Sequence, residues 1–381
     1  MLSDEITFTP EITTDPETGR KVRRLTDSLA HDAHFHLLYF NMYYYGEGGK
    51  WLVFGASKDD SNGFYRMDIP DETGELHARL LYQEKGLPVL RSCLDPAGGE
   101  WFYFHRGSAL CRMPSGGGEV EELFRLDDPS EQFSLVTVSS DGGRIAVSVG
   151  PVVKVEDSKP GTYGTFHERF RKIAWSRIVE VEIESKEHRT LVERDFWISH
   201  LLYRPGHSDT VLFCREGPWR EVDQRMWLLR DGELRKVRPQ APEDALGHEF
   251  WYPDGSRVGY HGRVPGKDGS EVEIVGIWNA GTDEWREWGV PTAPKGLFHT
   301  QVSPDMSHFI SDGNAQEPYI MRVDMPEDSD EAKITKLCRH DGTWDQTQGY
   351  QPHPTYHPGG RSIMFNSNRR DMHCDIYQVY L

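Results

Sequence analysis

The sequence predicts an all-β fold, a seven-bladed β-propeller of four-stranded antiparallel blades. The first observation is a phrase that recurs along the chain: a Gly- or Asp-containing turn, a polar residue and a short alternating apolar run. Its seven copies begin at Gly46, Asp95, Ser139, Arg204, Tyr252, Ser303 and His357. Most copies lie roughly 45 to 55 residues apart, the range expected of propeller blades.

The second observation concerns the segment after each copy. In most cases a short polar gap leads to further strand-like runs such as "GFYRMDI", "RMWLLR", "EIVGIWNA" and "DIYQVYL". Strands joined in this way form an antiparallel meander, and seven meanders suit a radial array that leaves few exposed edges. A β-sandwich could also hold many short strands, but so regular a repeat favours the propeller. We therefore expect residues 1–381 to form a single propeller domain.

Two segments have their own expectations. The run "ITFTPEI" near the start of the chain could pair with the last strand, "CDIYQVYL", and so close the ring. The interval between the third and fourth copies is longer, near 65 residues, and contains "EDSKPGTYGTFHERFRKIAWS". Its Pro-Gly start and basic-aromatic remainder indicate an insertion around residues 153–175, on one face of the ring, with a helical turn.

Composition limits the classes of function. With 27% charged and 37% hydrophobic residues the chain is globular. The acidic start "MLSDEITFTP" resembles no secretory signal, so we expect a cytoplasmic protein if Met1 is the native start. Five scattered cysteines without CxxC spacing make a disulfide framework or zinc-thiolate site improbable. The net charge of -18 argues against nucleic acid or an anionic membrane as partner, but a short anionic substrate fits a local basic pocket.

Propellers carry their sites on loops near the central channel, so we looked for reactive residues just before the repeated turn. The first candidate is His248 in "GHEFWYPDG". A neutral imidazole with an ordinary pKa near 6.5 accepts a proton well at neutral pH. The alternative is a histidine that only forms hydrogen bonds inside its blade.

The second candidate is the arginine-rich segment "FCREGPWREVDQRMWLL", because an arginine fork can hold both oxygens of a carboxylate. For Arg215 and Arg220 a solvated or salt-bridged role is favoured. Arg225 lies inside the apolar run "RMWLL", where an unpaired charge would be costly, so it needs a partner.

The third candidate is divided between the last two blades. It comprises His299 in "FHTQVSPD" and four residues of "WDQTQGYQPHPTYHPGG", namely Gln348, Gln351, His353 and His357. Imidazole and amide oxygen together could hold a divalent cation such as manganese. A polar loop network without a metal is the alternative.

In their order along the chain, "TDPETGRKVRRLTD", "REGPWREVDQRMWLL", "GHEFWYPDGS", "FHTQVSPD" and "QGYQPHP" resemble the oligogalacturonate lyase family. The resemblance implies a cytoplasmic seven-bladed propeller that cleaves short uronate oligosaccharides by β-elimination and carries manganese. It places the catalytic base at His248, the catalytic arginine at Arg225 and a metal ligand at His299. The other metal ligands fall on the family's Q-x-x-H-P-H motif, as Gln348, Gln351 and His353.

The sequence departs from the family in two places. Gln351 stands where a histidine is expected, which should weaken the metal site or change its ion. The stretch from His31 to Gly49 is rich in histidine and tyrosine, where the family is more basic. A related hypothesis therefore keeps the chemistry but changes the substrate to a glucuronate- or rhamnose-containing oligosaccharide. A non-catalytic binding propeller is the hypothesis from another class.

Overall fold

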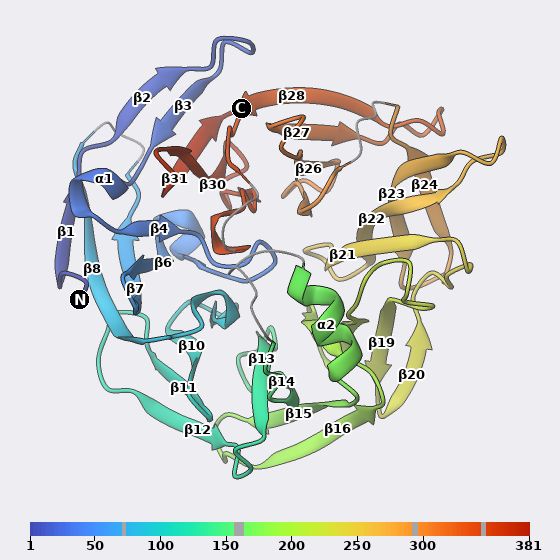
Figure 1. Cartoon of the computed structure of the whole chain (residues 1–381), viewed down its shortest axis with the longest axis horizontal. Coiled ribbons are helices and arrows are strands. Elements are labelled where there is room, and N and C mark those ends of the chain that lie inside the picture. The colour runs from blue at the N-terminus through green and yellow to red at the C-terminus, as the bar shows by residue number, and fades with distance from the viewer. Residues whose placement is uncertain (71–73, 156–163, 292–295, 344–347) are drawn as a thin grey trace.

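The computed structural model describes residues 1–70, 74–155, 164–291, 296–343 and 348–381. Seven antiparallel sheets stand in a ring, and each contains a four-stranded blade (Figure 1). The predicted seven-bladed propeller is therefore confirmed. The first and last sheets carry extra strands, because the N-terminal segment adds to both.

The blades succeed one another around the ring in chain order. The first comprises β4 (His34–His36), β6 (Trp51–Lys58), β7 (Ser61–Asp68) and β8 (Leu76–Lys85), with β1 (Glu5–Phe8) and β5 (Tyr45–Gly46) added. The second comprises β9 (Cys93–Leu94), β10 (Trp101–Arg106), β11 (Ala109–Pro114) and β12 (Glu121–Arg125). The third comprises β13 (Glu131–Val138), β14 (Arg144–Pro151), β15 (Ser176–Glu182) and β16 (His188–Arg194).

The second half of the ring repeats this pattern. The fourth blade comprises β17 (Ile198–Arg204), β18 (His207–Arg215), β19 (Met226–Arg230) and β20 (Glu233–Lys236). The fifth comprises β21 (Ala245–Trp251), β22 (Arg257–Pro265), β23 (Glu271–Asn279) and β24 (Trp285–Gly289). The sixth comprises β25 (Thr300–Val302), β26 (His308–Asp312), β27 (Tyr319–Asp324) and β28 (Lys333–Arg339). The seventh comprises β29 (Thr355–Tyr356), β30 (Ser362–Arg370), β31 (His373–Tyr380), β3 (Lys21–Arg24) and β2 (Glu11–Thr14).

The ring is closed by β3, which pairs with β31 through Val22 and Val379. The expected pairing of residues 6–12 with the last strand is therefore wrong. Strand β1 instead pairs with β8 and buries Ile6 and Phe8 against the first blade. Strand β2 lies outside β3 with all four residues exposed. Val22 decides the closure, because it is the residue that packs into the apolar cluster of the last two blades.

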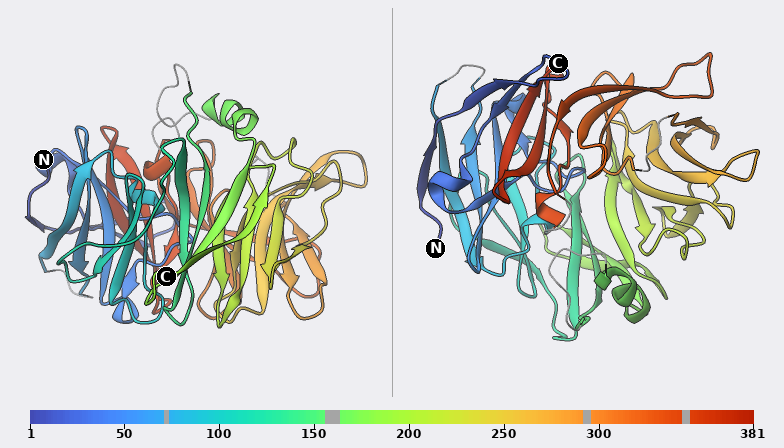
Figure 2. Two further views of the ribbon diagram at one scale, coloured as in Figure 1. Left: turned by 90° about the horizontal axis from the view of Figure 1, so that it is seen from below. Right: turned by 45° about the horizontal axis from the view of Figure 1, so that its top comes forward.

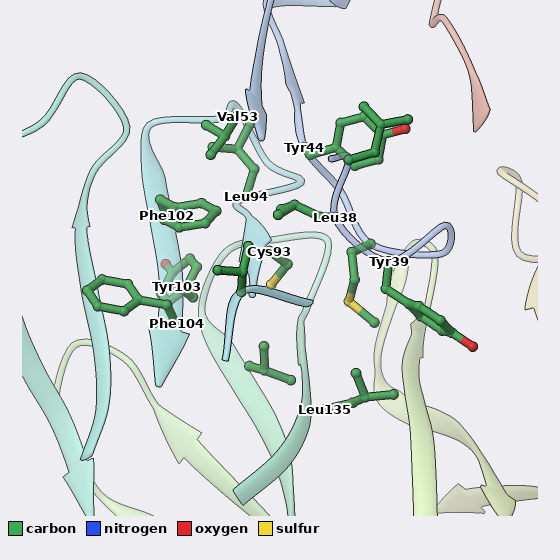
Figure 3. Packing of buried hydrophobic residues seen from close by; sticks show 14 of the residues in the cluster. Leu38, Tyr39, Tyr44, Val53, Cys93, Leu94, Phe102, Tyr103, Phe104 and Leu135 are labelled. Atoms are coloured by element: carbon green, nitrogen blue, oxygen red, sulfur yellow. The ribbon is translucent and has the colours of Figure 1, made fainter. Parts of the chain in front are cut away.

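Apolar side chains fill the space between neighbouring blades. Phe64 of β7 meets Phe102 of β10 edge to face, with ring centroids 4.7 Å apart. Leu38, Val53 and Leu94 pack beside Phe102, whereas Tyr39 points away from them (Figure 3). The five cysteines are free and buried. Aromatic pairs of this geometry add stability beyond the area they bury, which favours rigid blades around the channel.

The short helices lie between strands. They are α1 (Ser28–His31), α2 (Gly164–Lys172) and the 3-10 turns η1 (Glu47–Gly49), η2 (Val89–Arg91) and η3 (Gln348–Tyr350). Helix α2 comes after β14 within the insertion expected around residues 153–175, and residues 156–163 of that insertion lie outside the described residues. It rises above one face of the ring (Figure 2). Within the described ranges, no helix has the length and apolar character needed to span a membrane.

Irregular pairing of the innermost strands positions the site. The ladder between β17 and β18 shifts register between Ser199 and Leu202, and that between β21 and β22 shifts between Gly247 and Phe250. Such bulges turn a side chain away from the regular alternation of a strand. His200 and His248 lie within these two bulges.

Candidate active site

Each blade has one equivalent position shortly before its turn, and several of these positions carry the side chains of the site. Counting five residues back from the second residue of each turn phrase gives Met42, Arg91, Leu135, His200, His248, His299 and His353. Four consecutive blades thus present a histidine at equivalent positions. The repeat spacing alone would have pointed to two further residues, His200 and Arg91, which the motifs do not include.

Three of these histidines have a strained backbone. His200, His248 and His353 have φ angles of +50°, +49° and +45°. The left-handed region costs a residue with a side chain about 1–3 kcal/mol, and such strain gathers at functional sites. His299 is fixed differently: its backbone N–H donates to Asp312 Oδ1 at 2.7 Å, and its Nδ1 lies 2.7 Å from Asp312 Oδ2.

The structure brings His248, His299 and His353 together. The ring centroids of His248 and His299 are 4.8 Å apart, and those of His299 and His353 are 4.1 Å apart. His248 Nδ1 lies 2.8 Å from His261 Nε2, which orients the His248 ring. Burial, together with the neighbouring His299 and His261, holds the pKa of His248 well below its ordinary value. His248 is therefore neutral at neutral pH and can accept a proton.

The side chains expected to bind a metal have the environment of metal ligands. Both ring nitrogens of His353 and Oε1 of Gln351 are buried without a hydrogen-bond partner among the described residues. Asp312 holds Nδ1 of His299, the carboxylate arrangement that usually orients a metal-binding histidine. Imidazole and amide oxygen suit a divalent transition ion. Gln348 is exposed on η3 and lines the cavity beside Gln351.

Arg225 lies deeper, where it is 2% exposed. Its Nε donates to Glu249 Oε2 at 3.0 Å, and its Nη1 donates to Glu216 Oε1 at 3.1 Å. The expectation that this buried arginine needs a partner is confirmed. Of the other arginines in that segment, Arg215 pairs with Asp223 and Arg220 with Glu271. Those two are held by ion pairs at the surface, as expected.

His200 links the buried ion pairs to the cavity. Its Nδ1 lies 3.1 Å from Glu249 Oε1 and its Nε2 lies 3.4 Å from Glu216 Oε2. Donor atoms of His200, Cys214 and Glu216 lie within 4.8 Å of one another, the spacing of a possible metal site. However, Arg225 already neutralises Glu216, and burial holds the pKa of the Cys214 thiol well above its usual value. These residues therefore suit a hydrogen-bonded network that fixes Arg225 better than a cation site.

A cavity of about 720 Å³ opens beside the histidines, within the ~300–1,000 Å³ typical of ligand pockets. His200, Glu216, Gln348 and Gln351 line it, whereas His248, His299 and His353 lie behind Tyr39 and Phe40. The Tyr39 ring is 5.0 Å from His353, and the Phe40 ring is 5.2 Å from His299. Residues of the stretch from His31 to Gly49, which is expected to differ from the family, thus lie against the histidines.

Comparison with known proteins agrees with this geometry. Residues 2–282 match the family described as oligogalacturonate lyase. The chain is 26% identical over 377 residues to an oligogalacturonide lyase of Pectobacterium atrosepticum, covering 93% of this chain and 92% of the relative. It is 27% identical over 375 residues to an oligogalacturonate lyase of Dickeya dadantii, with the same coverage of 93% and 92%.

Two solved structures are similar over almost their full length. One is an oligogalacturonate lyase in complex with manganese, with a TM-score of 0.85 and 25% identity, covering 100% of this chain and 98% of the other. The second is an oligogalacturonate lyase from Vibrio parahaemolyticus, with a TM-score of 0.83, 25% identity and the same coverage.

Proposed function

The chain belongs to the oligogalacturonate lyase family, and from that premise we propose that it cleaves short uronic-acid oligosaccharides by β-elimination. The product would be a 4,5-unsaturated uronate at the new non-reducing end. The observation that carries the proposal is the convergence of His248, His299 and His353, which come from three adjacent blades. Family membership alone does not say which residues of this chain carry out the reaction, since function depends on the site and not on the fold.

In the proposed reaction His248 removes the proton from C5 of a 4-linked uronate. Electron density moves from C5 into the adjacent carboxyl group, and then the bond from C4 to the bridging oxygen breaks. Burial keeps His248 neutral, which leaves a ring nitrogen free to accept that proton but lowers its basicity, and His261 orients the ring. Arg225, to which the resemblance assigns the role of catalytic arginine, acts from behind the cavity: Glu216 and Glu249 fix its position, and its charge helps to keep His248 neutral.

A cation held by His299 and His353 would provide charge stabilisation. When held by His299, His353, Gln348 and Gln351, a divalent cation such as manganese would neutralise the substrate carboxylate and so acidify C5. Gln351 presents an amide oxygen where the family has an imidazole, so we expect weaker metal binding than in its relatives.

Tyr350 lines the same cavity and is suited to protonate the leaving oxygen. Burial raises the pKa of Tyr350 to about 12, so its hydroxyl stays protonated at neutral pH. Its hydroxyl lies 3.0 Å from Ser57 Oγ, which fixes its direction.

Tyr39 lies on the expected path of a sugar ring from the cavity to the buried histidines. Its ring lines the cavity and lies 5.5 Å from the His200 ring and 5.0 Å from the His353 ring. We therefore expect substrate binding to displace this side chain.

The test is the appearance of unsaturated uronate, monitored by its ultraviolet absorbance, when the protein is mixed with digalacturonate or trigalacturonate. His248→Asn should lower kcat by about 100- to 10,000-fold, the usual contribution of a general base. His308→Asn is the matched control, because His308 is equally buried but contacts Tyr356, and neither residue lines the cavity. Full activity of His248→Asn would overturn the assignment of the base. A non-catalytic propeller would give no unsaturated product with any oligouronate.

A further inference from the structure

Arg91 occupies in the second blade the position that histidines occupy in the fourth to seventh blades. It lies five residues before Pro96, as His200 lies before Pro205 and His248 before Pro253. It also lines the cavity that His200 and Gln351 line. The cavity beside the histidines is therefore lined by an arginine as well.

Arg169 joins it from helix α2, which rises over that face of the ring (Figures 1 and 2). Burial, and then the positive charge of Arg169, lowers the pKa of Arg91, which indicates that the two guanidinium groups lie close together. Arg91 Nη1 donates to the carbonyl oxygen of Phe133 at 2.7 Å. Within the described ranges no carboxylate forms an ion pair with Arg91 or Arg169.

An unneutralised arginine pair is notable in a chain with 61 acidic and 43 basic residues. Two guanidinium groups that repel each other in a cavity are stabilised by an anion placed between them. Arginine suits a carboxylate particularly well, because its planar fork donates to both oxygens. Beside the pair, the rings of Phe166 and Trp197 have centroids 5.5 Å apart and line the same cavity. They offer an apolar wall for the face of a sugar ring.

We infer that Arg91 and Arg169 form a second carboxylate subsite, which binds the sugar attached to O4 of the reacting uronate. This inference rests on the proposed function and assigns the residues that select a charged sugar at the leaving position. An oligosaccharide in which a neutral sugar such as rhamnose precedes the reacting uronate should then be a poor substrate. The insertion that carries α2 then serves to complete the substrate site.

The experiment compares digalacturonate with its monomethyl ester, in which the carboxylate of the leaving sugar is neutral. Wild-type protein should show a kcat/KM about 10- to 100-fold lower for the ester, the usual effect of losing a charged hydrogen bond. Arg169→Gln and Arg91→Gln should each lower kcat/KM for digalacturonate by a similar factor and leave that for the ester unchanged. Arg171→Gln is the matched control, because Arg171 is exposed on the same helix and lies outside the cavity lining.

Equal effects of the arginine variants on both substrates, or no effect on either, would overturn the subsite. Calorimetric binding of digalacturonate separates this failure from failure of the proposed function. If wild-type protein binds the dimer without cleaving it, and Arg169→Gln weakens binding about 10-fold or more, the subsite stands and the lyase proposal fails. If wild-type protein neither binds nor cleaves it, both fail.

Discussion

The buried ion pairs around Arg225 allow a quantitative test. Glu249 is fully buried and accepts from Arg225 Nε at 3.0 Å, and its other oxygen lies 3.1 Å from His200 Nδ1. Glu249→Gln keeps the shape of the side chain but removes its charge. Removing one partner of a buried pair costs about 3–5 kcal/mol, and we expect the lower end because Glu216 still contacts Arg225.

For a chain of 381 residues, an unfolding entropy of about 2.1 cal/mol/K per residue converts ~3 kcal/mol into a Tm decrease of about 4 °C. The assay is differential scanning calorimetry of the wild-type and variant proteins in the same buffer. Glu122→Gln is the control, because Glu122 pairs with Arg125 at the surface, where both side chains are more than a third exposed. Solvent screens that pair, so its loss should lower Tm by no more than about 1 °C. Equal Tm changes in the two variants would refute the idea that the buried carboxylates fix Arg225.

Three further predictions concern pH and metal. Burial lowers the pKa of His105 and of His340 to about 3, so below pH 6.5 the unfolded chain gains protons that the folded chain does not. The free energy of unfolding should therefore fall as pH drops from 6.5 toward 3, by ~2 kcal/mol per histidine at pH 5. Wild-type protein should lose Tm between pH 7.5 and pH 5, and His105→Asn should lose less. An equal loss of Tm in the two proteins would contradict this. Manganese added to metal-free protein at about 100 times its Kd should stabilise the fold by ~2.7 kcal/mol, and His353→Ala should abolish that gain in thermal scans. Gln351→His should tighten manganese binding measured by calorimetry, because imidazole replaces an amide oxygen; weaker binding would show that Gln351 does not face the metal.

The propeller could be predicted from the sequence because its signal is local and repeated. Each turn and the apolar run after it lie within about a dozen residues, so periodicity alone fixes the architecture. The closing strand could not be predicted in the same way. Residues 6–12 and 21–24 are both short and alternating, and the choice between them depends on Val22 packing against blades far along the chain.

The candidate site was predictable only in part. His248, His299 and His353 can be found from motifs, and the structure brings them together. His200 and Arg91 can be found from their position in the repeat, which motif comparison does not use. The carboxylate network around Arg225 could not be predicted, because Glu249 reaches it from the next blade. Likewise, no local pattern shows that Tyr39 covers histidines more than 150 residues away in the chain.

The central claim is that one uronate binds with its C5 at His248 and its carboxylate at the cation that His299 and His353 would hold. The most direct measurement is a crystal structure of His248→Asn with digalacturonate bound, since the inactive variant keeps the substrate intact. We expect C5 of the reacting uronate within about 3 to 3.5 Å of the position that a ring nitrogen of His248 occupies in the wild-type protein, with Tyr39 turned away. A sugar bound elsewhere in the cavity, with Tyr39 still against His353, would contradict the claim.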